Sequence, residues 1–148
     1  MKHRKLSLIV FLCLVVGIPV IFFSFFTPYK RIERYVMKSL GGKLEHSCNY
    51  YLEKGDVNPY GLETTEVAGI YGDTIKIVQF EYSGVGMRSD TKRYGYYYSP
   101  DDIPVPYCNE NYALTETADG EWTWIGEGDS GGIIKKIRDH VYYFEAWF

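Results

Sequence analysis

The chain has 148 residues, a formal net charge of −3, 46% hydrophobic and 24% charged residues, and 18% aromatic residues that include 15 tyrosines. This length allows one compact domain, and the composition excludes an intrinsically disordered chain. Residues 1–43 carry eight Lys/Arg against one acid (+7) and residues 44–148 carry eight against 18 (−10), and so acidic a domain excludes nucleic acid as a partner.

Residues 6–26, LSLIVFLCLVVGIPVIFFSFF, follow a short basic segment, residues 1–5, that we predict to be cytoplasmic. The run is 21 residues long and contains no charge. As a helix it would span about 30 Å, the thickness of a bilayer's hydrocarbon core. Lysines and arginines flank it on both sides, where they can meet headgroup phosphates. We therefore predict an uncleaved signal-anchor that crosses the lipid bilayer once.

A cleavable signal peptide is the alternative for this segment. Its apolar core would be about 7–15 residues long, and a small residue would precede the cleavage site. The run here is longer and ends in the bulky Phe25 and Phe26. Cleavage after Val15-Val16-Gly17 would leave a very apolar new terminus. Length and flanks favour the anchor.

The side of the membrane that the domain occupies is not decided by charge, because basic residues are balanced across the span. Its acidity and its two cysteines, Cys48 and Cys108, favour an extracytoplasmic position, where a disulfide can form. Such a bond would close a loop of about 60 residues and contribute roughly 4 kcal/mol. Two unlinked buried thiols remain the alternative.

A basic juxtamembrane helix or stalk is predicted over residues 27–43. Thr27 is a suitable cap, Pro28 fits the first turn, and Gly41-Gly42 would end the helix. One stripe of this helix is apolar, namely Ile32, Tyr35, Val36 and Leu40. The stripe would lie on the membrane surface or pack under the domain, or the helix would continue the membrane span as a stalk.

Residues 44–148 are predicted to form an acidic, aromatic-rich and mainly β domain with an antiparallel sheet, with a small α+β fold as the variant. Short β-branched and aromatic runs alternate with Gly, Pro, Asn and Asp, which is typical of strands joined by turns. The predicted strands are 48–53, 64–71, 74–82, 93–98, 121–126, 132–138 and 141–147. YGDT (71–74) would form a hairpin turn, and so would Arg138-Asp139-His140. Long loops remain at 83–92 and 99–120.

Gly128-Asp129-Ser130-Gly131-Gly132 resembles the nucleophile segment of chymotrypsin-like serine proteases. The resemblance implies Ser130 as nucleophile, and His46 would be a candidate base. It covers five residues, however, and only 18 residues follow Ser130, too few for the strands that build such a protease's specificity pocket. We therefore expect a glycine-rich turn, no catalytic residues and no enzyme activity.

A metal site is not expected either. Four acids surround two glycine-containing turns, as calcium prefers: Asp119, Glu121, Glu127 and Asp129. Their spacing matches no known loop, and the three histidines are too scattered for zinc. The sequence predicts no metal and no cofactor.

Aromatic side chains are the best candidates for a binding site, because the domain has more of them than a small core requires. In strands, Trp122 and Trp124 share one face, and Tyr96 and Tyr98 share one face. The predicted binding residues are Trp122, Trp124, Tyr96, Tyr98, Tyr143 and Trp147. We expect a membrane-anchored, noncatalytic module that binds a protein. Carbohydrate binding through Trp122 and Trp124, or a small hydrolase using Ser130, are the alternatives.

Overall fold

The computed structural model describes residues 27–55, 68–71, 75–85, 91–107 and 111–148. The predicted span 6–26 and the amino-terminal residues 1–5 lie outside these ranges. Within the described part of the chain, no helix combines the length and the apolar character that crossing a bilayer requires.

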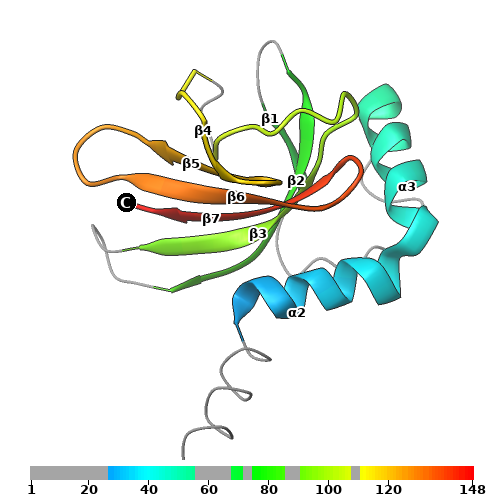
Figure 1. The fold of residues 1–148 in the computed structure, drawn as a ribbon. Helices are drawn as coiled ribbons and strands as arrows, with labels where there is room; N and C mark the ends of the chain where they lie inside the picture. Colours follow the sequence, from blue (N-terminus) through cyan, green and yellow to red (C-terminus); the bar gives the residue numbers. More distant parts are fainter. Residues whose placement is uncertain (1–26, 56–67, 72–74, 86–90, 108–110) are drawn as a thin grey trace, which may run out of the picture.

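Seven strands form one antiparallel sheet in the described residues, which confirms a mainly β fold (Figure 1). The order across the sheet is β1-β2-β3-β7-β6-β5-β4. The strands are β1 (Ala68–Tyr71), β2 (Ile77–Val85), β3 (Lys92–Tyr98), β4 (Thr115–Ala118), β5 (Glu121–Ile125), β6 (Gly131–Arg138) and β7 (Val141–Trp147). Neighbours in sequence pair as hairpins except at the centre, where β3 pairs with β7 from Lys92 opposite Trp147 to Tyr98 opposite Val141.

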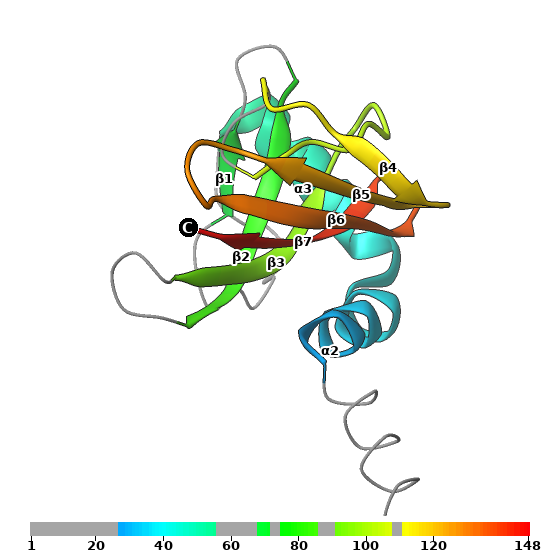
Figure 2. The same cartoon turned by 60° about the vertical axis from the view of Figure 1, so that its left-hand side comes forward.

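Two helices lie on one side of the sheet (Figures 1 and 2). Helix α2 (Pro28–Tyr35) begins as predicted, because the Thr27 hydroxyl accepts a hydrogen bond from the Lys30 amide at 3.4 Å. The helical segment ends at Gly41 as predicted, but a second helix that was not predicted starts at the same residue. The chain passes through a π-helical turn (Val36–Leu40), changes direction at Gly41 (φ 43°, ψ −137°) and continues as α3 (Gly41–Lys54).

The predicted strand 48–53 is therefore wrong, since these residues belong to α3. The physical reason is the spacing of Leu44, Cys48, Tyr51 and Leu52, which places them on one helical face against the sheet. Gly55, with a left-handed φ of 67°, ends the helix. The edge strand β4 was not predicted, because all four of its residues are exposed and show no apolar alternation.

Both faces of the sheet are buried at its centre. On the helix side, Ile32, Val36 and Leu40 pack on the sheet, so the apolar stripe of the juxtamembrane segment lies under the domain. The sheet residues of this core are Val78, Phe80, Tyr96, Tyr98, Val141 and Tyr143. The opposite core contains Ile77, Tyr97, Trp124, Ile134, Tyr142, Phe144 and Ala146, together with Val105 and Tyr107 from the loop after β3.

Candidate binding surface

The structure divides the six predicted binding aromatics between the two faces of the sheet. Trp122 and Trp124 lie on the face away from the helices, which confirms that they share a face. The other four belong to the helix side by strand alternation: Tyr96, Tyr98, Tyr143 and Trp147. The six side chains therefore do not form one surface.

The three tyrosines hold the helices against the sheet. Tyr96 stacks on Phe80 with ring centres 4.8 Å apart, and Tyr143 meets the edge of Tyr29 at 5.2 Å. Tyr98 is also buried, and it lies 6.0 Å from the His140 ring. Burial raises the pKa of Tyr96 and of Tyr143 well above its usual range. These rings belong to the core and offer a partner little surface.

Trp124 is buried as well, at 2% exposure. Tyr112 stacks on its ring at 5.2 Å with the planes 10° apart. A β-carbon at Gly132 would overlap the indole nitrogen, so the ring packs directly on the backbone of this glycine. The indole N–H has no hydrogen-bond partner. Trp122 is half-buried and tilts against Tyr142 at 6.0 Å, so it is the more accessible of the two tryptophans.

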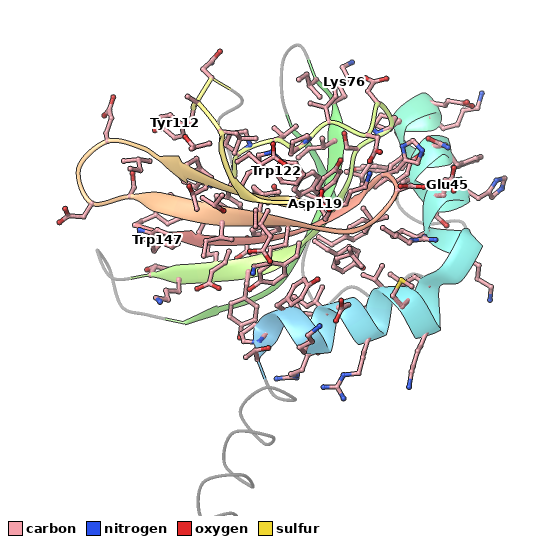
Figure 3. The ribbon with its side chains drawn as sticks, in the orientation of Figure 1. Glu45, Lys76, Tyr112, Asp119, Trp122 and Trp147 are labelled. Carbon is pink, nitrogen blue, oxygen red and sulfur yellow. The ribbon has the colours of Figure 1, made fainter. Side chains whose placement is uncertain are left out.

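An exposed apolar surface lies on the helix side, at the end of the sheet that α2 does not reach. In one cross-strand row, Ile125 stands opposite Gly131, and Gly131 stands opposite Trp147. A β-carbon on Gly131 would stand 3.0 Å from the Trp147 ring, so this indole extends over the glycine towards β5. Ile125 is 81% exposed. We call Ile125 and Trp147 the strand-end patch; Figure 3 shows the position of Trp147.

Sequence reasoning missed Ile125, although alternation carried the signal. If Trp122 and Trp124 face the core in β5, Thr123 and Ile125 must face the other way. Phe148, which is 42% exposed, follows Trp147 and packs its ring 5.7 Å from Tyr107. The apolar surface at this end of the sheet thus includes Ile125 and Trp147 on the helix face and Phe148 on the opposite face.

Residues 126–130 form the turn between β5 and β6, so Gly128, Asp129 and Ser130 of GDSGG lie in a turn as predicted, whereas Gly131 and Gly132 begin β6. The Gly126 N–H donates to the Ser130 carbonyl at 3.0 Å, and Gly128 has a φ of 64°. The Ser130 hydroxyl donates to the Glu127 carbonyl at 2.7 Å. His140 lies in the hairpin at the opposite end of β6, and His46 is on α3, so neither histidine is placed as a base for Ser130.

A polar cluster that the sequence did not reveal fastens the loop after β3 to the β6–β7 hairpin. The Asp102 carboxylate accepts from Lys136 at 2.6 Å, from the His140 amide at 2.8 Å and from the Tyr142 hydroxyl at 2.8 Å. Burial acts to raise the pKa of Asp102, but these hydrogen bonds outweigh it and hold the pKa at about 2. So acidic a carboxylate is a poor general base near neutral pH. The cluster fits a structural role.

Of the two predicted disulfide partners, Cys48 lies within the described residues, and so do the four acids considered for calcium. Cys48 is a buried free thiol on α3, and burial raises its pKa to about 12. Its predicted partner Cys108 lies outside the described ranges, so the disulfide stays a prediction. Among residues with described positions, no group of three or more His, Cys, Asp or Glu side chains is arranged to hold a metal ion.

Comparison with known proteins gives no relative from which a role could be transferred. No protein-family model, no curated protein and no solved structure matches the chain. The functional argument therefore rests on the surface geometry.

Proposed function

We propose that this chain is a membrane-anchored, noncatalytic binding module whose β domain engages a protein partner through the strand-end patch. The observation that carries the proposal is Ile125, 81% exposed in the same cross-strand row as the Trp147 ring. A single exposed isoleucine is ordinary on a protein surface. Together with the Trp147 indole and Gly131, which has no side chain, Ile125 forms an apolar anchor of the kind that dominates protein interfaces.

The surroundings of the patch indicate the chemistry of the partner. Glu127 and Asp129 are exposed in the adjoining turn, and residues 44–148 as a whole carry a charge of −10. Lys92, opposite Trp147 in the sheet, is the basic residue of this row. A complementary partner would present an apolar side chain flanked by lysine or arginine.

The sequence supports the anchor. Residues 6–26 contain no charge, and Thr27, which caps helix α2, follows them directly in the sequence. A tether keeps the domain close to membrane partners, so a small patch of modest affinity suffices. We place the domain outside the cytoplasm because of its acidity. A reporter enzyme fused after Phe148 tests this placement, and activity in the cytoplasm would contradict it.

The two alternatives have weaker support. A sugar platform requires accessible ring faces, and Trp124 is buried with Tyr112 stacked on it. A hydrolase requires an activated hydroxyl, and the Ser130 hydroxyl donates within its own turn. Both observations favour protein binding over these roles.

Photo-crosslinking in the native membrane tests the proposal. A photoreactive phenylalanine analogue is introduced at Ile125 in the full chain, and at Tyr50 on α3 as an exposed control. We expect one defined protein adduct from position 125 that position 50 does not give. The absence of an adduct at 125, or the same products from both positions, would count against the patch.

A further inference from the structure

The outward face of α2 is cationic. Residues 27–43 contain five Lys/Arg and one acid, a net charge of +4, whereas residues 44–148 carry −10. The helix buries Ile32 and exposes Lys30 and Arg34, and Lys38 and Met37 are exposed in the turn that follows. In Figure 3, nitrogen-tipped side chains extend from α2 on the side away from the sheet.

Glu33, the acid of residues 27–43, does not cancel the positive charge of this face. Glu33 accepts from Lys30 at 2.7 Å and from Tyr29 at 3.1 Å, so it neutralises one charge at the first turn. Arg34 and Lys38 follow Lys30 at intervals of four residues, so they lie on the same side of the helical segment, and both are exposed. The helix thus presents a cationic stripe with the apolar Met37 within it.

The helix is held firmly against the body of the domain. Lys135 of β6 lies 5.5 Å above the Tyr29 ring, and Arg31 donates to the Tyr82 hydroxyl at 3.3 Å. At the other end, Arg138 donates to the Gly41 carbonyl at 2.7 Å. Whatever binds the outer face of α2 therefore orients the whole sheet, and with it the strand-end patch.

We infer that this face, Lys30, Arg34 and Lys38 with Met37, docks on the anionic headgroups of the bilayer that residues 6–26 cross. The inference rests on the anchoring proposed above. The apolar run ends at Phe26 and α2 starts at Pro28, so these cations begin within one helical turn of the predicted membrane boundary. Lys30, roughly 6 Å of helix from Phe26, lies within a Debye length of an anionic surface, about 8 Å at physiological salt. Arg34 and Lys38, roughly 12 and 18 Å along the helix from Phe26, come that close when α2 lies along the surface.

Docking lays α2 along the membrane surface, with its apolar stripe towards the sheet and its cations towards lipid. The acidic remainder of the domain is then directed away from the like-charged headgroups. The single acid of the segment, already paired with Lys30, does not oppose this arrangement. The result is one fixed orientation of the module on its anchor.

The test uses the full chain in lipid nanodiscs, with a photoreactive residue at Met37 or, as a control, at Tyr50 on α3. Nanodiscs contain either phosphatidylcholine alone or phosphatidylcholine with about a third phosphatidylserine. We expect lipid adducts from position 37 in the anionic discs, and few from position 50. The adducts should disappear in 1 M salt, where the Debye length falls to about 3 Å.

Matched variants isolate the charge. Because a basic residue near such a surface contributes about fivefold, Arg34→Gln with Lys38→Gln should reduce the adduct roughly 25-fold. Lys54→Gln with Lys76→Gln removes the same charge from exposed sites away from α2 and should leave the yield unchanged. Near-ultraviolet circular dichroism of the aromatic core checks that each variant is folded.

Failure of docking and failure of the anchor give different results. If the chain does not enter the discs, or carbonate washing removes it, the anchor is wrong and the inference falls with it. If the chain is inserted but position 37 gives equal adducts in both lipid mixtures, or none, electrostatic docking is wrong and the anchor stands. A protein adduct from position 37 in native membranes would assign this face to a protein instead.

Discussion

The indole nitrogen of Trp124 lies over Gly132, so close that a β-carbon on this residue would overlap it. The neighbouring glycine makes the same arrangement on the other face of the sheet, where the Trp147 ring lies 3.0 Å from the point where a β-carbon on Gly131 would stand. Adjacent strand residues point to opposite faces of the sheet, so one tryptophan packs on Gly131 on one face and the other packs on Gly132 on the opposite face. Packing thereby accounts for the two glycines at the end of GDSGG.

Gly132→Ala should be strongly destabilising. The added methyl group would meet the Trp124 indole and, at 2.5 Å, the Glu145 carbonyl, and a backbone contact cannot be relieved by a rotamer change. We expect a loss of about 3 kcal/mol in the free energy of unfolding, measured with urea in detergent. Gly42→Ala on α3, where no atom lies within 4 Å, should instead stabilise by up to about 1 kcal/mol. Equal stability of the two variants would contradict this packing role.

Much of the sheet follows from sequence, because β3, β5, β6 and β7 are dense in aromatic and β-branched residues between clear turns. Strand β2 is buried on both faces, because Val78 and Phe80 pack towards the helices while Ile77 and Gln79 are buried on the other side, so alternation of apolar residues does not mark one core face there. The β3–β7 pairing joins residues far apart in the chain, and no local signal specifies it.

Asp102→Asn should make stability less dependent on pH. The pKa of Asp102 is lowered from 3.8 to about 2, so its ionised form contributes stability above about pH 4 that is lost as the pH falls towards 2. At pH 7 we expect the variant to lose about 2 kcal/mol in urea unfolding. At pH 2 the variant and the parent chain should have nearly the same free energy of unfolding. Asparagine tolerates the positive φ of 55° at this position, so backbone strain is not added.

The neighbouring residue is the control for this experiment. Asp101 is exposed, and Asp101→Asn should change the free energy of unfolding by less than about 0.5 kcal/mol at either pH. If Asp102→Asn shows the same small effect at pH 7, the cluster does not fasten the loop.

Ser130→Ala should affect the turn and no chemistry. Removing the hydroxyl that donates to the Glu127 carbonyl should cost about 1 kcal/mol in urea unfolding. We expect no fluorophosphonate labelling of the parent chain, while a serine hydrolase added to the same sample is labelled. Labelling that disappears in Ser130→Ala would contradict a noncatalytic role and favour a hydrolase.

The candidate site was less predictable than the sheet. Aromatic content indicated Tyr96, Tyr98 and Tyr143 as binding residues. These tyrosines are buried, however, because α2 and α3 cover them, and the sequence pattern did not predict α3. Asp102 carries no local signal, since Lys136 and Tyr142 are 34 and 40 residues away. Ile125 could have been found from the alternation of β5 alone.

Ile125→Thr tests the strand-end patch with little effect on the fold. Threonine keeps the β-branched shape that suits a strand, and the side chain is 81% exposed, so the free energy of unfolding should change by less than about 0.5 kcal/mol. Binding of the partner identified by crosslinking should weaken about fivefold or more, because an apolar anchor at an interface centre contributes over 1 kcal/mol. Ile103→Thr makes the same replacement at an isoleucine that is 42% exposed on the loop after β3, and it should bind normally. If both variants bind like the parent chain, the partner uses another surface, and the exposure of Ile125 beside Trp147 has no part in recognition.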